Sequence, residues 1–229
     1  MTVISWIICW LLTAVIAAAA QAPAPTRFDM VVREDFFAGF GGDQDRLAHG
    51  MEACERVLAA NPKHAEAMVW HGSGLFFQSG AAFRQGDTAR GLEMYGRGIK
   101  EMDDAVALAP DNVGVLIPRG AVLLTGTRFM PPDQTAPLIQ KAVADYEKAL
   151  TLQAASGQFE TLGDHPKGEL LFGLAEGYSR LGQPDRARVY FERLLKDAGG
   201  SGHVAQAQAF LATGAPPAVQ GLGCVGCHK

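Results

Sequence analysis

Two segments of the chain share a pattern that fits packed α-helices and few other structures. Residues 50–62 and 98–110 each place small and apolar side chains at positions i, i+4, i+7 and i+8, and each segment ends at a proline. This spacing gathers the apolar side chains on one face of a helix, and the proline stops the helix before it. The pattern predicts two amphipathic helices whose apolar faces need neighbours to cover them.

Two more segments repeat this pattern, residues 142–152 and residues 187–195. In the last copy, seven residues fall at the spacing of the Trp-Leu-Gly-Tyr-Gly-Ala-Phe pattern of the tetratricopeptide repeat, a helix–turn–helix of 34 residues. These residues are Leu171, Leu174, Ala175, Tyr178, Gly182, Ala187 and Phe191. The chain therefore resembles the tetratricopeptide-repeat (TPR) family, and the resemblance implies an all-α fold, a TPR-like helical-hairpin solenoid over residues 27–211. Gly72 and Gly120 occupy the first-helix glycine position of the second and third copies, where a small residue lets two helices approach closely.

The spacing between copies departs from 34 residues in three places. The segment from Pro62 to Pro110 is longer than one 34-residue repeat. Its extra residues fit a turn at residues 84–87 between two helices that are each about two turns longer than those of a standard repeat. In the third copy, residues 125–133 have the Pro-Pro and Gly content of a loop. Pro118 falls inside that copy's first helix and should kink it, at a cost of about 3 kcal/mol unless packing offsets it.

Other turn signals lie nearer the C-terminus. We expect loop residues around Gly157 and in the segment 163–166, before the fourth copy. A short last helix over residues 202–211, with Ser201 as its N-cap, would cover the last repeat. Residues 212–223, which contain Pro216-Pro217 and three glycines, are predicted to be a linker.

The N-terminal segment has the composition of an export signal. Residues 3–20 carry no charge, are strongly apolar and end in Ala18-Ala19-Ala20. We interpret residues 1–20 as a signal peptide, followed by a linker at residues 21–26. No Lys or Arg precedes Arg27, and about 18 apolar residues could also act as an uncleaved membrane anchor. Both interpretations place residues 27 onward outside the cytoplasm, in the periplasm or at the cell surface.

The cysteines and charges narrow the chemistry further. Cys9 lies in the signal segment, Cys54 lies at a core-facing helix position, and only Cys224 and Cys227 are close together. A disulfide-stapled scaffold is therefore not expected. The net charge is −4 and the basic residues are scattered, which argues against nucleic acid as a partner.

Residues 224–229 read Cys-Val-Gly-Cys-His-Lys, a C-x-x-C-H motif. Two thiols at this spacing add across the two vinyl groups of one haem, and the adjacent histidine is then held beside the iron. The motif predicts one covalent haem c on Cys224 and Cys227, with His228 as proximal axial ligand. A local disulfide, a thioredoxin-like redox pair and half of a zinc site are the other interpretations. A thioredoxin-like pair would follow a strand, and zinc would need two more ligands nearby.

The whole chain is similar to bacterial TPR proteins that carry a c-type haem motif at the C-terminus. This resemblance implies electron transfer in the periplasm or at the cell surface. It also implies a redox partner protein or a membrane-associated complex as partner; direct membrane contact is expected only if the N-terminal segment stays uncleaved.

Two residues are candidates for the distal haem ligand. Met130 stands before Pro131 in the predicted loop, as ligand methionines do in small cytochromes c, and His165 stands before Pro166. His203 is a weaker candidate, and His71 is expected to be a buried structural histidine. Cys54, Met68 and Met102 are expected in the core. His49 is expected at a helix surface, and His64 is expected between helices. The acidic pair Asp103-Asp104 is expected to be solvated.

Three functions follow from a haem on a helical repeat. The leading expectation is a one-electron carrier whose repeat docks a partner, so that the chain is not itself an enzyme. The alternatives are an interaction scaffold in which the haem acts as a sensor, and a peroxidase-like haem enzyme with an open iron site.

Overall fold

The computed structural model describes residues 27–216, and over this range the chain is all-α, as predicted. Residues 27–216 form ten α-helices and two short 3₁₀ helices, and no strand is found among them. The α-helices are α1 (Asp29–Phe40), α2 (Gln44–Ala60), α3 (Ala65–Arg84), α4 (Thr88–Leu108), α5 (Val113–Gly126), α6 (Ala136–Ala155), α7 (Gln158–Thr161), α8 (Asp164–Arg180), α9 (Pro184–Asp197) and α10 (Val204–Thr213). The 3₁₀ helices are η1 (Thr127–Phe129) and η2 (Pro132–Gln134).

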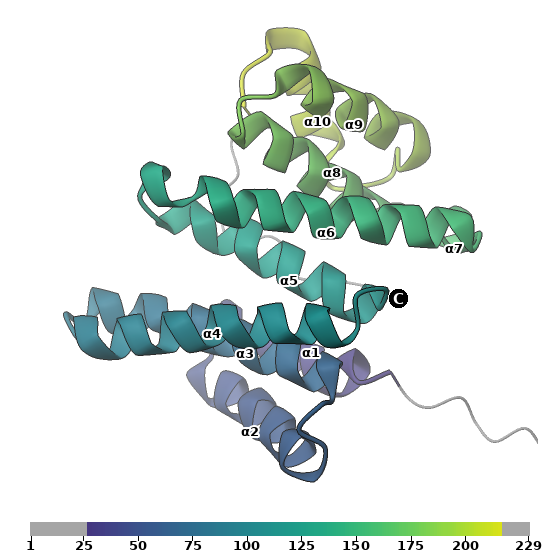
Figure 1. Cartoon of the computed structure of the whole chain (residues 1–229). Helices are drawn as coiled ribbons and strands as arrows, with labels where there is room; N and C mark the ends of the chain where they lie inside the picture. Colours follow the sequence, from purple (N-terminus) through teal and green to yellow (C-terminus); the bar gives the residue numbers. More distant parts are fainter. Residues whose placement is uncertain (1–26, 217–229) are drawn as a thin grey trace, which may run out of the picture.

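Helices that follow each other in the sequence also pack against each other. The packed pairs are α1 with α2, α3 with α4, α5 with α6 and α8 with α9, and α10 packs on α9. Neighbouring pairs are joined by the contacts of α2 with α3, α3 with α5 and α6 with α8. Figure 1 shows the result, a stack that runs from α2 through the α3–α4 and α5–α6 pairs to α9 and α10.

Side-chain caps explain where the predicted helices begin. The Asp43 side chain accepts a hydrogen bond from the backbone N–H of Arg46 at 3.0 Å, at the start of α2. Asp87 accepts one from the N–H of Arg90 at 3.1 Å, at the start of α4. Such caps satisfy backbone donors that have no partner inside the helix, and each stabilises the helix by about 1 kcal/mol.

The pair α3–α4 is the elongated hairpin predicted from the spacing of Pro62 and Pro110. The two helices have 20 and 21 residues, against 17 and 14 in the pair α8–α9. The turn between them contains Gly86 with φ +80°, a left-handed conformation that glycine adopts at little cost. The turn therefore lies within the predicted segment 84–87, between two long helices.

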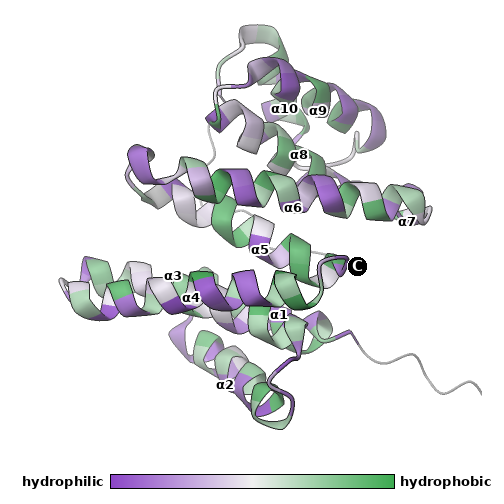
Figure 2. Ribbon diagram, viewed as in Figure 1, coloured by the Kyte–Doolittle hydropathy of each residue, from purple (hydrophilic) through white to green (hydrophobic). Residues whose placement is uncertain are grey.

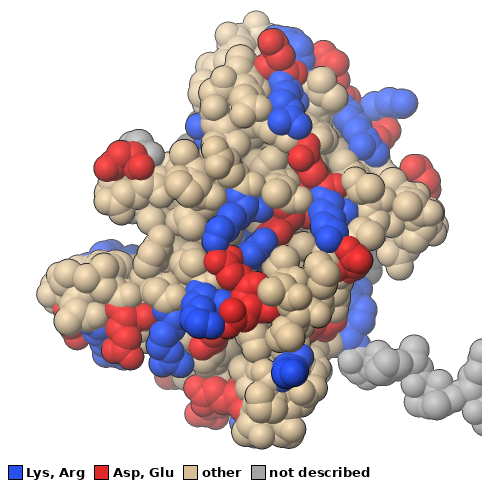
Figure 3. Space-filling model, viewed as in Figure 1, with Lys and Arg blue, Asp and Glu red and all other residues tan. Residues whose placement is uncertain are grey.

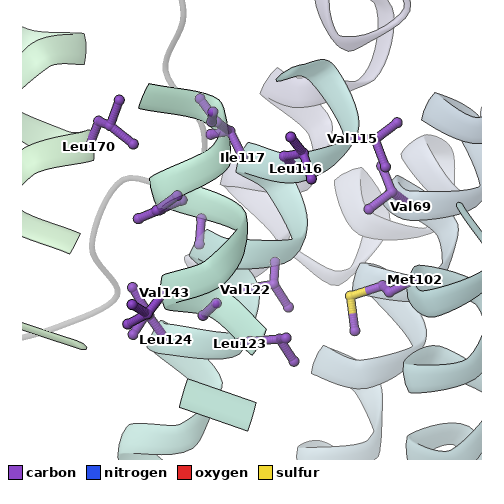
Figure 4. Packing of buried hydrophobic residues seen from close by; sticks show 14 of the residues in the cluster. Val69, Met102, Val115, Leu116, Ile117, Val122, Leu123, Leu124, Val143 and Leu170 are labelled. Atoms are coloured by element: carbon purple, nitrogen blue, oxygen red, sulfur yellow. The ribbon is translucent and has the colours of Figure 1, made fainter. Parts of the chain in front are cut away.

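Helix α5 lies at the centre of the buried core. Figure 4 shows its side chains between Val69 and Met102 on one side and Val143 and Leu170 on the other. A largely apolar helix is stable only when it is covered by its neighbours, and Figure 2 shows green and pale residues along much of α5 with a hydrophilic interruption. The buried hydrophobic residues of α5 are Val115, Leu116, Ile117, Ala121, Val122, Leu123 and Leu124. Helix α5 continues through Pro118, as predicted, and this burial is the packing that offsets the cost of the proline.

Two predicted loops were wrong in part. Thr125 and Gly126 belong to α5, and the rest of the predicted loop 125–133 contains η1 and η2. Residues 164–166 form the first turn of α8 and are not a loop. Pro166 is compatible with this position because the first backbone N–H groups of a helix have no partner inside it.

The last helix begins two residues later than predicted. Helix α10 covers residues 204–213, its N-cap residue is His203, and Ser201 is not the cap. The Ser201 hydroxyl instead accepts a hydrogen bond from the N–H of His203 at 3.2 Å, within the turn before the helix. The first two residues of the predicted linker 212–223 belong to α10.

None of the helices between residues 27 and 216 combines the length and the apolar character needed to cross a bilayer. The predicted signal peptide or anchor (1–20) and the linker 21–26 lie outside the described residues.

Candidate functional site

The residues predicted to hold haem, Cys224, Cys227 and His228, also lie outside the described residues. Within residues 27–216, no group of three or more His, Cys, Asp or Glu side chains is arranged to hold a metal ion. The structure does place both candidates for the distal ligand, and it places them in different surroundings.

Met130 follows η1 and lies partly buried against the core. Its side chain lines a groove of about 440 Å³ that four helices form, α1, α3, α4 and α5. The position confirms that Met130 lies in the segment between α5 and α6. It also shows that this methionine faces an apolar groove, which the sequence did not predict.

Aromatic rings form much of the groove wall. Phe40 comes from α1, Phe76, Phe77 and Phe83 come from α3, and Tyr95 comes from α4. The rings of Phe40 and Phe77 pack with centroids 4.7 Å apart, and those of Phe76 and Tyr95 with centroids 5.7 Å apart. These contacts fix the rings in the edge-to-face or tilted arrangements that aromatic pairs prefer.

The groove wall has few polar groups. The Ser79 hydroxyl donates a hydrogen bond to the carbonyl oxygen of Phe76 at 2.6 Å. Burial raises the pKa of the Tyr95 phenol above its ordinary value of 10.0, so this hydroxyl stays neutral. Arg84 is an exposed residue at the end of α3. The groove can therefore hold a flat apolar group and leaves one cation at its margin.

An ion pair fixes the segment that carries Met130. Arg128 pairs with Glu176 of α8 through two hydrogen bonds, one of them from Nε to Oε1 at 2.8 Å. Arg180, also on α8, donates to the carbonyl oxygen of Leu124 and to the hydroxyl of Thr127, both at 2.8 Å. Two-fold pairing between a guanidinium and a buried carboxylate gives a well-defined geometry, so the segment just before Met130 is held in one position.

His165 differs from Met130 in its position, its exposure and its neighbours. It lies in the first turn of α8, its side chain is 54% exposed, and its Nδ1 is 3.8 Å from a carboxylate oxygen of Glu169. It does not line the groove. The structure therefore does not bring the two candidates to one site.

His203 is already engaged on both ring nitrogens. Nε2 is 2.9 Å from Glu169 and Nδ1 is 3.1 Å from Oε1 of Gln206, and the ring stacks on Phe172 with centroids 4.0 Å apart. Burial alone would lower the pKa of His203, but the hydrogen bond and the charge of Glu169 outweigh it, and the pKa is raised above 6.5. This histidine ties α10 to α8 and has no free nitrogen for a ligand.

The remaining candidates have the structural positions predicted for them. His71 is buried, with Nδ1 2.5 Å from Glu101. His49 is largely exposed, and the ring nitrogen of His64 accepts the capping hydrogen bond from the N–H of Ala67 at the start of α3. The predicted core residues Cys54 and Met102 are buried, and Met68 is partly buried against the same cluster.

Asp103 is the exception among the surface predictions. Its side chain is 39% exposed, as a solvated residue should be, but its carboxylate also accepts hydrogen bonds from Arg119 of α5 at 2.8 Å and from Lys141 of α6 at 2.5 Å, which the sequence did not predict. Asp104 is half-exposed and pairs with Lys100 one turn earlier, as a surface residue does. The reason for the difference is tertiary, because Arg119 and Lys141 come from helices distant in sequence.

The same arginine makes a buried pair. Nε and Nη2 of Arg119 donate to the two carboxylate oxygens of Asp145, each at 2.6 Å, and both residues are less than 10% exposed. Burial raises the pKa of Asp145 although Arg119 opposes the shift. Figure 3 shows that Lys and Arg side chains alternate with Asp and Glu over the middle of the face in view, so this face has no region of a single sign.

Comparison with known proteins gives no family assignment: the chain matches no protein-family model and no curated protein.

Proposed function

We propose that this protein is an exported c-type cytochrome that transfers single electrons, with a TPR-like helical solenoid as its docking surface for a redox partner. One haem is bound through Cys224 and Cys227, with His228 as an axial ligand. The observation that carries the proposal is the spacing of these three residues in the sequence. When bound, the haem supplies a one-electron couple, and the protein sets its potential through the axial ligand and the surroundings.

The described residues support a helical domain that forms its own core. The buried residues between Phe28 and Phe210 form one hydrophobic cluster that draws on nearly all the α-helices. The last described helix ends at Thr213 and is capped by Gly214, which has φ +70°. A haem attached beyond this point would add to a folded domain and would not be needed to build it.

The packing of the pairs supports the TPR-like solenoid. The seven residues that match the repeat pattern lie where such a repeat needs them: all except Gly182 are buried, and Gly182 has φ +71° in the turn between α8 and α9. Gly120 lies against the ring of Tyr146, where an added Cβ would come within 2.6 Å of a ring carbon. Close helix contacts at small residues are what the repeat requires.

A pair of cysteine variants tests the haem proposal. Wild type, Cys224→Ala/Cys227→Ala and Cys54→Ala are exported from cells with haem-attachment machinery and run on a denaturing gel stained for haem. We expect staining of the wild type and of Cys54→Ala, since Cys54 is buried in the core, and none of the double variant. The far-UV circular dichroism of the double variant should stay close to that of the wild type. An unstained wild type, or a stained double variant, would refute the proposal.

A further inference from the structure

We propose that the aromatic groove formed by α1, α3, α4 and α5 seats the haem of the same chain, with the thioether of Met130 as the iron ligand opposite His228. This inference rests on the function proposed above. It adds what the sequence motif leaves open, namely where on the helical domain the haem lies.

The chemistry of the groove fits a porphyrin. A haem is a flat apolar plate with two carboxylates on one edge, so it needs apolar walls and a cation at the margin. The rings of Phe77, Phe83 and Tyr95 supply walls, and Arg84 supplies the cation. Its volume of about 440 Å³ lies in the range of small-molecule sites. The guanidinium of Arg84 can bind the haem carboxylates. The Phe83 side chain is 40% exposed, and a flat ligand in the groove would cover this apolar surface.

Two residue types in the groove wall can bind haem iron, a methionine and a tyrosine. Tyr95 would bind as a phenolate, and its burial raises the pKa and keeps the proton on. Met130 binds without losing a proton, and the pairs of Arg128 with Glu176 and of Arg180 with Thr127 hold its segment in place. Met130 is therefore the better donor of the two.

The tail that carries the haem motif is long enough to span several packed helices. Residues 217–223 separate the last described residue from Cys224, and an extended chain of this length covers roughly 25–30 Å. Helix α5 contacts α8, α8 packs on α9, and α9 carries α10. Packed helices lie roughly 8–10 Å apart, so an extended tail of this length spans about three of them. The haem on the chain's own tail is therefore the occupant that we assign to the groove.

Two glycines offer a matched test of the groove. At Gly80, in the groove wall, an added Cβ meets only Nη1 of Arg84 at 3.4 Å, an ordinary contact with a flexible side chain. At Gly96, on α4 away from the groove, an added Cβ meets nothing within 4 Å. Both glycines lie inside helices, so leucine should be tolerated at either. Only Gly80→Leu places a side chain in the groove.

The readout is the iron's axial ligation in the exported, haem-loaded full chain. We expect the wild type and Gly96→Leu to show the charge-transfer absorption of a methionine–iron(III) bond and no carbon monoxide binding when reduced. Gly80→Leu should lose the absorption and bind carbon monoxide. Met130→Leu should also lose the absorption and bind carbon monoxide, and its reduction potential should fall because a methionine ligand raises it. Met30→Leu, at an exposed position of α1, should show none of these changes.

Haem staining separates the two proposals. A stained wild type that binds carbon monoxide, or a Gly80→Leu variant identical to wild type, would refute the groove and leave the cytochrome intact. An unstained wild type would refute both. Ligation that is lost on dilution of the protein would show that the haem comes from a second molecule, and would overturn the assignment to the same chain.

Discussion

Helices α3 and α4 approach each other through two glycines, Gly72 and Gly98, and this contact gives a sharp test of the packing. An added Cβ at Gly98 would lie 2.7 Å from the carbonyl oxygen of Gly72 and 2.7 Å from the backbone nitrogen of Phe76. Both are backbone atoms of a packed helix, so they cannot turn aside as the end of a side chain can. Gly96 lies on the same helix, where an added Cβ would meet nothing within 4 Å.

The expected effects of alanine at these two positions have opposite signs. Replacing a glycine inside a helix by alanine stabilises the protein by about 0.5–1 kcal/mol when the Cβ has room. Gly96→Ala should show this gain in the free energy of unfolding. At Gly98 the helices must move apart, and overpacking of this kind costs about 1–3 kcal/mol. Gly98→Ala should therefore be less stable than Gly96→Ala by about 1–3 kcal/mol.

Urea unfolding followed by far-UV circular dichroism measures both free energies with a common m-value. In thermal unfolding the two variants should differ by roughly 2–4 °C for each kcal/mol, the sensitivity of a domain of this size. A Gly98→Ala variant as stable as Gly96→Ala would refute the close approach of α3 and α4, and with it the geometry of the groove between them.

Two further predictions concern charged residues that link the helices. Arg119→Leu leaves Asp145 buried without its partner and should lower the free energy of unfolding by about 3–5 kcal/mol. The double variant Arg119→Leu/Asp145→Leu should recover much of this loss. A loss below about 1 kcal/mol in the single variant would contradict the buried pair. His203→Gln tests the link from α10 to Glu169. The pKa of His203 is raised in the folded state. The charged histidine therefore adds its full contribution to the free energy of unfolding below the ordinary pKa of about 6.5, and this contribution disappears as the pH rises through the folded-state pKa. Wild type should thus be more stable than His203→Gln at about pH 6, by a margin that shrinks toward about pH 9; a margin independent of pH would show that the charge of His203 does not contribute.

The sequence predicted the helices and their order because those depend on local signals. Apolar stripes, terminating prolines and the turn at Gly86 together place α2, α3, α4, α6 and α9, and the excess spacing between Pro62 and Pro110 predicts the long α3–α4 pair. The errors occurred where a signal fits two structures. Pro166 and its neighbours have the composition of a loop, yet they form the first turn of a helix, where a proline costs no hydrogen bond.

The features that only the structure reveals depend on residues far apart in the sequence. The partners of Asp103 could not be predicted because Arg119 and Lys141 come from other helices. The groove was missed for the same reason, since Phe40, Phe83 and Met130 come from three separate segments. The aromatic residues concentrated in the elongated part of α3 were the one local signal that could have indicated it.

The central claim is that the chain is exported and carries one covalent haem, and an intact mass with an absorbance spectrum of the purified protein tests it directly. The claim predicts the mass of residues 21–229, or of the full chain if the N-terminal segment is an anchor, plus one haem. It also predicts the reduced-minus-oxidised spectrum of a c-type cytochrome. A colourless protein with the mass of the polypeptide alone, whose Cys224 and Cys227 are free or joined to each other, would contradict it.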